Sequence, residues 1–597
     1  MITPMTKYAF ILLNGEQDAL LERIQEIGLV DITRSIKPMD EESHRISADI
    51  ELLDGMIRGI RNVQVPENIQ PQVYEGDGSE DLVRLSAGTL MCLTEAQGEV
   101  ESLRRQIHNL KVWGDFDASL IEKLADAGVQ LHFHKVSAKA FKETWPQEYA
   151  LVEIGRDKEG VYFVVVGEDT LPGEIPAPKN DWNKLEAQLS EQEKNLELLY
   201  GEVLTLKQRL PELEKLRADA YAQMDLHLAG AAAVPAAEGT IVTLVGYAPS
   251  EKDAEVSAAL DATGAYYMKE AAVVQDNPPI SFKNNWFVRQ FETLTDMYGR
   301  PAYDGFDPTP FISVFFLLFF ALCMGDAGYG LILIVIGLLL KKVDSFRSLS
   351  PLVVLLGIAT VVVGFFMHTF FSMDIAQWEI FQPVKGIFLP DEIAGFAGGM
   401  VLAIIIGVIH LCLAMLVKAY TSVKNNGFAH SLGTLGWTLL IVGGVVVAAL
   451  SLIGVLDATL TKWIVIVLGV VSAIGIFPLN NLDRNKLANV GLGLWDTYNT
   501  VTGLLGDVLS YLRLYALGLA GSMLGMAFND MGKMVLGDGS NAILWVPFVL
   551  LVLIGHTLNI AMCALGAFVH PLRLNFLEFF KNSGYEARGR NYTPMKK

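Results

Sequence analysis

Residues 311–340 read FISVFFLLFFALCMGDAGYGLILIVIGLLL, two apolar runs joined by the short glycine-containing link MGDAGYG. Such runs are typical of segments that lie in the hydrocarbon core of a membrane. Before about Asp307 the chain is rich in charged residues, whereas further apolar runs follow the quoted stretch. The stretch therefore marks the boundary between a soluble N-terminal half, residues 1–305, and a membrane-embedded C-terminal half, residues 306–597.

The apolar runs after this boundary predict an α-helical membrane protein with about eight transmembrane helices. We expect the first two spans to be short and, since only MGDAGYG separates them, to form a tight pair. From about Lys486 to Phe528 the pattern stays helical without a proline, and about 40 residues reach roughly 60 Å, twice a ~30 Å hydrocarbon core. The last two spans are therefore expected to be long, and to tilt strongly, break or extend into the cytoplasm. The expected spans are 308–324, 326–341, 351–372, 396–417, 430–454, 460–479, 490–530 and 541–572.

Lysine and arginine gather in alternate loops between these spans, which orients the chain by the positive-inside rule. With the N-terminus inside, the loops on the opposite side hold only Lys385, Lys462 and Lys533. The N-terminus lacks the long apolar core of a signal peptide, so we expect both chain ends and the soluble half to be cytoplasmic. The basic residues on the cytoplasmic side are Lys341, Lys342, Arg347, Lys418, Lys424, Arg484, Lys486, Arg573, Lys581, Arg588, Arg590, Lys596 and Lys597.

Composition excludes several classes of function. The net charge of −20 comes mostly from the soluble half and argues against nucleic acid as a partner. The four cysteines lie far apart without CxxC or metal-ligand spacing, so no disulfide framework is predicted, which fits a reducing compartment. Without a P-loop, a GxGxxG motif after a strand or an HExxH motif, we expect no cofactor and no metal site. His132 and His134 alternate on a predicted strand, where packed or surface histidines are the favoured interpretation.

Three segments of the soluble half carry apolar residues in alternating steps of three and four, the spacing of helices that pack along a narrow seam. Their charged flanks favour long coiled-coil-like arms over about residues 39–113 and 181–225, and the core of an ordinary bundle is the alternative. Pro211 is expected to kink the last helix or to mark a joint. The seam residues are Ile46, Ile50, Leu53, Ile57 and Ile60, then Leu93, Ala96, Val100, Leu103, Ile107 and Leu110, then Trp182, Leu185, Leu189, Gln192, Leu196, Leu199, Val203, Leu206, Leu210 and Leu213.

Two small α/β lobes are predicted beside these arms. Residues 9–32 and residues 239–271 each read as strand, helix, strand, and we expect them to pack as counterparts in one proximal lobe, about 1–38 plus 238–280. A distal lobe, about 114–180, takes its strands from LHFHKV, EYALVEIG and GVYFVVVG. The whole region 1–305 is thus interpreted as a structural arm.

The membrane half contains one conspicuous charge. Residues 506–521 read GDVLSYLRLYALGLAG, and Arg513 cannot lose its proton in this apolar setting. Snorkelling and an internal pair with Asp507 are the structural alternatives, but Arg513 lies at least 17 residues from either end of its expected span, 490–530. Intramembrane arginine is costly and usually functional, and small neighbours would let another helix approach it closely. The residues on or near this face are Gly506, Ser510, Ala516 and Ala520.

The last span carries a line of polar residues on one helical face. Arg573 lies near its cytoplasmic end, where a positive-inside anchor is the alternative to a role in ion transfer. For the two histidines of the line, hydrogen bonding between helices is the alternative. His368 and His410, elsewhere in the membrane half, are interpreted as packed or interfacial. The residues of the line are His556, Asn559, Cys563, His570 and Arg573, with Gly566 and Ala567 between them.

The quoted stretch 506–521, followed by GHTLNIAMCALGAFVHPLRLNFLEFF at 555–580, resembles the two signature helices of the stator membrane subunit of rotary V-type and A-type ATPases. This is subunit I of bacteria and archaea, or subunit a of eukaryotic vacuolar enzymes. Residues 287–330 resemble the family's approach to its first two membrane helices. The resemblance covers the whole architecture, although in the soluble half it is one of pattern alone. The chain length is similar to that of the compact prokaryotic form, which implies a multi-pass protein of a prokaryotic cell membrane.

The resemblance implies a function as a non-catalytic stator that binds no ATP. In the family, an arginine at the position of Arg513 faces the carboxylates of a rotating proteolipid ring, and a second arginine corresponds to Arg573. The path for H⁺ or Na⁺ would use His556, Asn559, His570, Ser510 and Asp507. Eukaryotic members carry an acid at the position of Cys563, so this chain departs from the pattern there. The implied partners are the ring, peripheral-stalk subunits on the arm, and the lipid bilayer, within a multi-subunit complex.

Two other functions are open to a chain of this composition. A self-contained secondary ion transporter with a cytoplasmic regulatory domain would usually show internal repeats and matched broken helices, and no clear repeat is present. A purely structural membrane anchor would make Arg513 dispensable.

Overall fold

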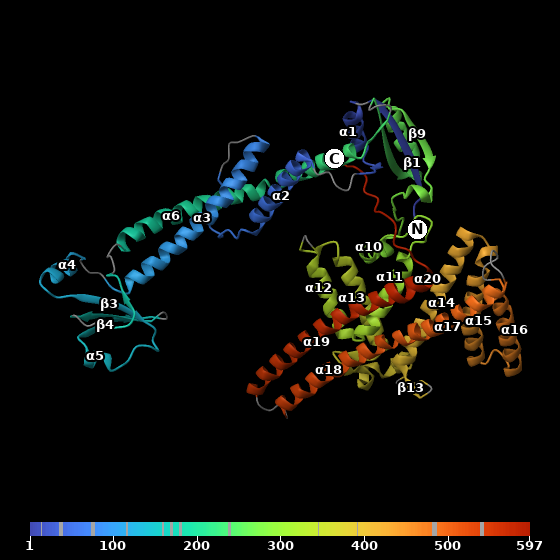
Figure 1. The fold of residues 1–597 in the computed structure, drawn as a ribbon. Coiled ribbons are helices and arrows are strands. Elements are labelled where there is room, and N and C mark those ends of the chain that lie inside the picture. The colour runs from blue at the N-terminus through green and yellow to red at the C-terminus, as the bar shows by residue number, and fades with distance from the viewer. Residues whose placement is uncertain are drawn as a thin grey trace. The chain divides into compact units, whose positions relative to one another are not determined.

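The computed structural model describes two compact units that interleave along the chain (Figure 1). The first unit comprises Met1–Ile11, Leu29–Ile32 and Val245–Pro594, and the second comprises Leu12–Gly28, Thr33–Leu244 and Met595–Lys597. Arg484 and Lys597, which entered the orientation argument, lie outside the described residues. The described residues are all except 14, 35–39, 73–77, 115–117, 158–159, 168–170, 178–181, 237–239, 344–345, 391, 394, 480–485, 538–541 and 597.

Paired helices form the long part of the second unit. Figure 1 shows α3 (Ser79–Lys111) side by side with α6 (Trp182–Gln208), and α2 (Glu41–Asn62) packs against α7 (Leu210–Ala231). The predicted seams supply the buried positions, among them Ile46, Ile50, Leu53, Ile57 and Ile60 of α2 and Leu93, Ala96, Val100 and Ile107 of α3. Pro211 lies in the first turn of α7, directly after the end of α6, so the predicted joint is confirmed.

Asp40 begins α2 as its N-cap. Its carboxylate accepts a hydrogen bond of 2.9 Å from the Ser43 amide, which satisfies one free donor of the first turn. Hydrogen bonds from Ser43, assisted by His227, lower the pKa of Asp40 to about 2. The cap is therefore charged throughout the ordinary pH range.

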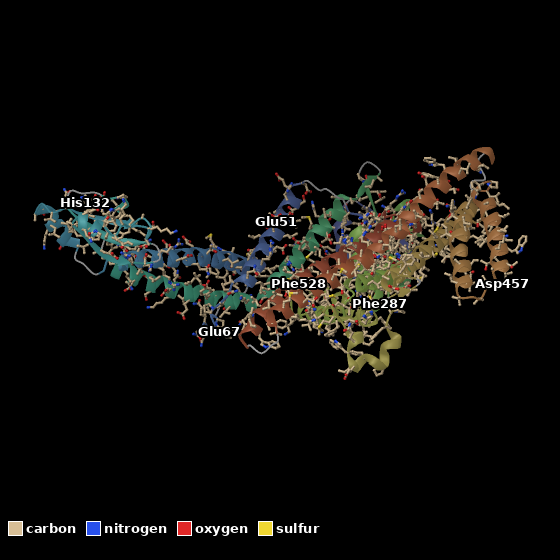
Figure 2. All side chains as sticks on the ribbon, turned by 90° about the horizontal axis from the view of Figure 1, so that it is seen from below. Glu51, Glu67, His132, Phe287, Asp457 and Phe528 are labelled. Carbon is tan, nitrogen blue, oxygen red and sulfur yellow. The ribbon has the colours of Figure 1, made fainter. Side chains whose placement is uncertain are left out.

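Along the chain, the segment between α3 and α6 forms a small antiparallel sheet. Its strand order is β4-β5-β3-β6, and Trp145, Val161 and Phe163 form its core. His134 is buried and stacks on Phe163 with ring centroids 5.1 Å apart, while His132 (Figure 2) lies 2.6 Å from Glu174. Burial lowers the pKa of His134. Both histidines are thus packed side chains, and no group of three or more metal-ligating residues occurs in the described part of the chain. The elements are α4 (Ala118–Asp126), β3 (Leu131–Val136), α5 (Trp145–Glu148), β4 (Leu151–Arg156), β5 (Val161–Val166) and β6 (Glu174–Ile175).

The two predicted strand–helix–strand segments are present and share one sheet, of order β2-β8-β1-β9. Thr6 pairs with Ala271, and Asp31 pairs with Tyr247, both antiparallel. The elements are β1 (Met5–Leu13), α1 (Gln17–Ile27), β2 (Asp31–Ile32), β7 (Val234–Ala236), which pairs with β8, β8 (Ile241–Pro249), α8 (Asp253–Asp261) and β9 (Tyr267–Ala271).

Apolar helices make up most of the first unit. Among the described residues, five helices are long and apolar enough to cross a membrane, whereas three further apolar helices have only 10–17 residues. The structure therefore supports five spans, and the predicted total of eight stays a prediction. The long helices are Gly398–Asn426, Ala429–Leu452, Ala458–Ile476, Asn489–Leu536 and Trp545–Ser583, and the shorter ones are Thr309–Met324, Ala327–Leu340 and Ser350–Phe366.

The elements of this unit follow one another with short hairpins between α13 and α14. The third apolar helix ends at Phe366, before the predicted residue 372, because a β-hairpin begins there. The elements are α9 (Trp286–Arg289), α10 (Glu292–Tyr298), α11 (Thr309–Met324), α12 (Ala327–Leu340), α13 (Ser350–Phe366), β10 (Thr369–Phe370), β11 (Met373–Asp374), β12 (Glu392–Ile393), β13 (Phe396–Ala397), α14 (Gly398–Asn426), α15 (Leu432–Leu452), α16 (Ala458–Ile476), α17 (Lys486–Ser510), α18 (Leu512–Leu536), α19 (Trp545–Arg573), the π-helical segment Leu574–Phe579 and α20 (Phe580–Ser583).

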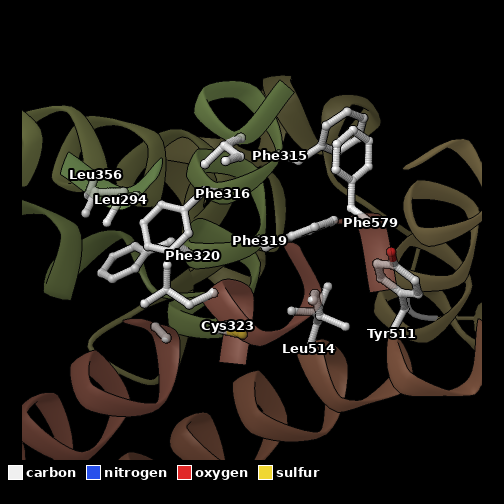
Figure 3. Close-up of a cluster of buried hydrophobic side chains, with 14 of the residues drawn as sticks. Leu294, Phe315, Phe316, Phe319, Phe320, Cys323, Leu356, Tyr511, Leu514 and Phe579 are labelled. Atoms are coloured by element: carbon white, nitrogen blue, oxygen red, sulfur yellow. The ribbon is translucent and has the colours of Figure 1, made fainter. Parts of the chain in front are cut away.

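The predicted tight pair of the first two spans is wrong. The close partner of α12 is α13, not α11. A β-carbon on Gly330 would lie 2.9 Å from the carbonyl oxygen of Gly357, so glycine on both helices permits their close approach. The helix α11 instead carries four phenylalanines into the core, where they meet α18 (Figure 3). These are Phe315, Phe316, Phe319 and Phe320.

Candidate functional site

Arg513 lies next to a break between two helices. α17 ends at Ser510 and α18 begins at Leu512, so Tyr511 interrupts the long run of residues 486–536. At the break the Tyr511 amide donates to the carbonyl oxygen of Val508 at 3.2 Å, the tighter spacing of a 3₁₀ turn. A break was one of the outcomes expected for this overlong helix.

Tyr511 anchors the break in the protein interior. Its side chain is fully buried, and its hydroxyl lies 2.9 Å from Nδ1 of His410 on α14. A β-carbon on Gly407 would lie 2.6 Å from Cδ2 of the tyrosine ring, so only glycine leaves room for that ring. His410 stacks on Phe579 with ring centroids 4.7 Å apart, and Figure 3 shows Tyr511 and Phe579 in this aromatic cluster. His410 is therefore a packed residue, as predicted, and the cluster positions the start of α18.

The guanidinium of Arg513 forms no ion pair among the described residues. The side chain is half-buried, and its Nη1 atom is buried without a hydrogen-bond partner among the described residues. Asp507 is engaged elsewhere, since it accepts a hydrogen bond of 2.7 Å from Asn582 and lies 3.3 Å from Lys581. The alternative of an internal Arg513–Asp507 pair is therefore wrong. A buried charge left without a partner is destabilising, which makes a structural role a poor explanation for this arginine.

A buried carboxylate that the sequence analysis did not single out lies within electrostatic range of Arg513. Glu578 belongs to the π-helical segment Leu574–Phe579 and is 4% exposed. Within the described chain its Oε2 atom has no hydrogen-bond partner. π-helical turns are rare and often occur at functional sites.

The remaining predicted residues near Arg513 differ in their exposure and in their hydrogen-bond partners. His570 lies within electrostatic range of Arg513 and Arg573, and its Nδ1 atom is buried without a hydrogen-bond partner in the described part of the structure. Arg573 itself is exposed at the end of α19. The Ser510 hydroxyl donates a hydrogen bond of 3.0 Å to the carbonyl oxygen of Gly506, so it is used within its own helix.

A second polar group lies further along α18 and α19. Tyr329 of α12 donates to Nδ1 of His556 at 2.7 Å and accepts from Asn559 at 2.8 Å. Nε2 of His556 then donates to Asn529 at 2.9 Å, and Asn559 also donates to the carbonyl oxygen of Gly521 at 2.8 Å. This connectivity assigns a neutral imidazole to His556, with its proton on Nε2. The network thus ties three helices together through matched donors and acceptors.

Asp326 lies at the start of α12, the helix that carries Tyr329 of this network. The residue is buried and caps α12, accepting hydrogen bonds from the amides of Gly328 and Tyr329. It also accepts from the amides of Phe371 at 2.9 Å and Ser372 at 2.6 Å. Phe371 and Ser372 both have positive φ, 48° and 57°, a conformation that costs energy in non-glycine residues. The link MGDAGYG is therefore a clamp for the hairpin after α13.

Cys563 lies between the two polar groups on α19. Its thiol donates to Oδ1 of Asn559 at 3.4 Å. A β-carbon on Gly521 would lie 2.5 Å from this sulfur, so α18 and α19 approach closely here. Cys563 thus places a small, uncharged side chain in a tight contact between the two helices.

The predicted residues therefore divide into two groups. Arg513, Asp507, Ser510, His570 and Arg573 lie around the start of α18, whereas His556 and Asn559 belong to the network with Tyr329. The sequence analysis missed Glu578, Tyr329, Asn529, Asp326 and Tyr511. Glu578 is a charge inside an apolar run, the same signal that identified Arg513. In chemical terms the site offers a fixed cation, with one donor atom unpartnered among the described residues, beside two separate polar clusters.

Known proteins resemble this chain over most of its length. The V-type ATPase 116kDa subunit family matches residues 234–375 and 496–597. The A-type ATP synthase subunit I of Methanocaldococcus jannaschii is 30% identical over 560 residues, which are 87% of this chain and 76% of that protein. The V-type ATP synthase subunit I 1 of Treponema pallidum is 26% identical over 642 residues. The V-type ATP synthase subunit I of Borreliella burgdorferi is 25% identical over 643 residues. Each alignment with these two covers 100% of both chains.

The two matched segments contain the features described above. The first includes the Asp326 clamp, and the second includes Arg513, Glu578 and the polar residues of α18 and α19. The chain therefore belongs to the V-type ATPase 116kDa subunit family, which includes subunit I of the V-type and A-type ATP synthases.

Proposed function

We propose that this chain is the membrane-embedded stator subunit of a V/A-type rotary ATPase. Residues 306–597 provide the path of H⁺ or Na⁺ against a rotating proteolipid ring, and residues 1–305 form the cytoplasmic arm that holds the peripheral stalks. The subunit is an integral protein of a prokaryotic cell membrane, with both chain ends in the cytoplasm. It hydrolyses no ATP itself.

The observation that carries the proposal is the unsatisfied Nη1 atom of the Arg513 guanidinium. Its Nη1 atom is buried without a partner among the described residues, while Ala516 and Ala520 on the same helix are exposed. Their small side chains leave α18 open to the close approach of another helix. A helix that brings a carboxylate to this face would supply the missing counter-charge.

The chemistry of the step follows from the fixed charge. A ring carboxylate within lipid is favoured as its neutral or ion-bound form, because a buried charge is costly. Beside the Arg513 guanidinium the ionised form becomes favourable, so the carboxylate releases its ion. The same positive charge repels a cation that tries to pass directly between the two sides. Arginine suits this role because it keeps its charge where lysine can lose it.

The two polar clusters are the proposed half-channels that lead to this point. One contains Glu578, His570 and Arg573, with Asp507 and Ser510 at its edge. The other contains His556, Asn559, Tyr329 and Asn529. Asn529 follows Arg513 by 16 residues on α18, about 24 Å of helix, so the clusters are offset across most of a ~30 Å hydrocarbon core.

We infer for the arm the domain arrangement expected from the sequence. The shared sheet of residues 1–38 and 238–280 forms the proximal lobe, and residues 114–180 form the distal lobe. The paired helices of 39–113 and 181–225 are the rigid element between them. Long packed helices resist bending, which a stator needs in order to withstand the torque of the rotor.

The test is a substitution of the fixed charge in the assembled complex. Arg513→Ala, with subunit content and expression matched to wild type, should abolish ATP-driven ion uptake into membrane vesicles. Lys533→Ala is the matched control, since Lys533 is an exposed cation on the same helix and forms an ion pair with Asp530. Coupled uptake that persists in Arg513→Ala at normal assembly would refute the proposed mechanism.

A further inference from the structure

A polar cavity of about 270 Å³ lies in the first unit, outside the site described above. Three segments far apart in sequence form it: residues 301–306, which lead into α11, residues 418–426 at the end of α14, and residues 583–586 after α20. Figure 1 shows α14 and α20 close together, and the two helices are in contact. Asn425 donates to the carbonyl oxygen of Asp304 at 3.2 Å and joins the first two walls.

The cavity carries charges of both signs. Lys418 lines it from α14, and in the described structure this lysine has no ion-pair partner. Asp304 and Glu586 line it from the other two segments. The side chain of Asp304 is likewise without an ion-pair partner among the described residues, whereas Glu586 contacts Arg588 at 3.3 Å. Residues that carry one cation and two carboxylates thus line a single space.

The cavity also contains an unused hydroxyl. Oγ1 of Thr421 is buried and has no hydrogen-bond partner within the described residues. Thr421 follows Lys418 by three positions on α14, so both side chains lie on the same helical face. A buried polar group without a partner costs free energy, which a ligand bound in the cavity would offset.

We propose that this cavity binds a phosphoethanolamine headgroup. Lys418 and the Thr421 hydroxyl donate to the phosphate, and the carboxylates of Asp304 and Glu586 accept hydrogen bonds from the primary ammonium. A purely anionic headgroup would meet two carboxylates, and a purely cationic ligand would meet the lysine. The phosphoethanolamine part has about eight non-hydrogen atoms, which fit in this volume even if each takes the ~30 Å³ of a liquid water.

The position of the cavity favours a lipid as the source of this headgroup. The cavity lies where α14, a 29-residue apolar helix, reaches its polar end, so its walls stand at the level of lipid headgroups. Tyr420 is exposed beside the cavity-lining residues, as is usual for tyrosine at a membrane interface. A bound phosphatidylethanolamine would tie the end of α14 to the segment that leads into α11 and to the segment after α20.

The experiment is native mass spectrometry of the full-length chain in detergent, titrated with lipids of one acyl composition. We use phosphatidylethanolamine, its N-monomethyl and N,N-dimethyl derivatives, phosphatidylcholine and phosphatidylglycerol. Because each methyl group removes one N–H donor, retention should fall along the series. The total loss should be at least about tenfold by phosphatidylcholine, because losing one charge-assisted hydrogen bond costs about tenfold and its trimethylammonium can donate to neither carboxylate. Equal retention along the series, or preferred retention of phosphatidylglycerol, would overturn the proposal.

Variants and a soluble competitor locate the site and its source. Asp304→Asn should remove the preference for phosphatidylethanolamine, whereas Thr421→Val should weaken the retention of every phospholipid in the series, because all of them carry the phosphate. Lys424→Gln should change neither, since Lys424 also lies near the end of α14 but does not line the cavity. Soluble phosphoethanolamine should displace the lipid only at much higher concentration, because it lacks the acyl chains. Equal potency of the soluble compound would overturn a lipid as the occupant. Wild-type preference in Asp304→Asn together with wild-type retention in Thr421→Val would overturn this location.

Discussion

Gly407→Ala tests whether the contact between α14 and Tyr511 positions Arg513. Gly407 faces the Tyr511 ring, and an added β-carbon would lie 2.6 Å from Cδ2 and 2.8 Å from Cβ of the tyrosine. Ordinary van der Waals contact begins at 3.4 Å, so the ring or the helix must move by about 1 Å. The substitution therefore pushes the break between α17 and α18 without changing any polar group.

The size of the effect follows from this displacement. Inserting a methyl group into a well-packed core costs about 1–3 kcal/mol. A shift of ~1 Å in a positioned catalytic group can lower a rate by about 10²-fold. Because Arg513 follows Tyr511 by two residues in the first turn of α18, we expect ATP-driven ion uptake to fall between tenfold and a hundredfold, with a modest loss of thermal stability.

The assay compares Gly407→Ala with Gly444→Ala in membrane vesicles at equal amounts of assembled complex. Gly444 lies in the apolar helix α15 with nothing within 4 Å of an added β-carbon, so this control adds the same methyl group without a clash. The control should pump at the wild-type rate. Wild-type pumping by Gly407→Ala would refute the argument that this contact positions the arginine.

Two further predictions concern the polar network and the sheet. Asn559→Leu leaves the carbonyl oxygen of Gly521 and the hydroxyl of Tyr329 without their donor, so it should lower the free energy of unfolding by about 1–3 kcal/mol. Thermal unfolding in detergent measures this loss, and an unchanged stability would contradict the assigned network. Lys7 donates a hydrogen bond of 2.6 Å to Asp276 and lowers the pKa of this carboxyl group below its usual 3.8. The ionised carboxylate therefore stabilises the folded state above about pH 4, and this stabilisation is lost as the pH falls through the pKa of the folded state. Acidification from pH 7 to about 3 should therefore destabilise wild type more than Lys7→Met in the same unfolding assay, and equal acid sensitivity would exclude the pair as a contributor.

The sequence predicted the soluble elements well because their pattern directly reports which face is buried. The steps of three and four that include Ile46, Ile50 and Leu53 appear as buried residues of α2. Pro211 marks a helix start, since proline lacks the amide hydrogen that a helix interior needs. The domain boundaries drawn from these patterns stay predictions, because they depend on how whole segments associate.

The membrane half was less predictable from pattern alone. Nearly every residue of α11 and α12 is apolar, so periodicity does not show which neighbour each face meets, and the pairing of α12 with α13 depends on glycines in both helices. The polar partners Tyr329 and His556 are 227 positions apart in sequence, and no local signal connects them. Arg513 was predictable because a permanent charge in an apolar run is conspicuous in the sequence.

The separation of the two polar clusters supports the proposal that ions pass this chain on a rotor. Between Arg513 and Asn529, α18 carries only Tyr515 and Ser522 as side chains with conventional hydrogen-bonding groups, while Gly521 and Cys563 bring α18 and α19 into close contact. An ion therefore meets no continuous line of polar side chains on α18 from one cluster to the other. If an ion is to cross, a carrier outside the chain must take it from one cluster and deliver it to the other. A ring of carboxylates that passes the exposed face of Ala516 and Ala520 meets this requirement, and Arg513 would ensure that each carboxylate arrives empty before it loads again.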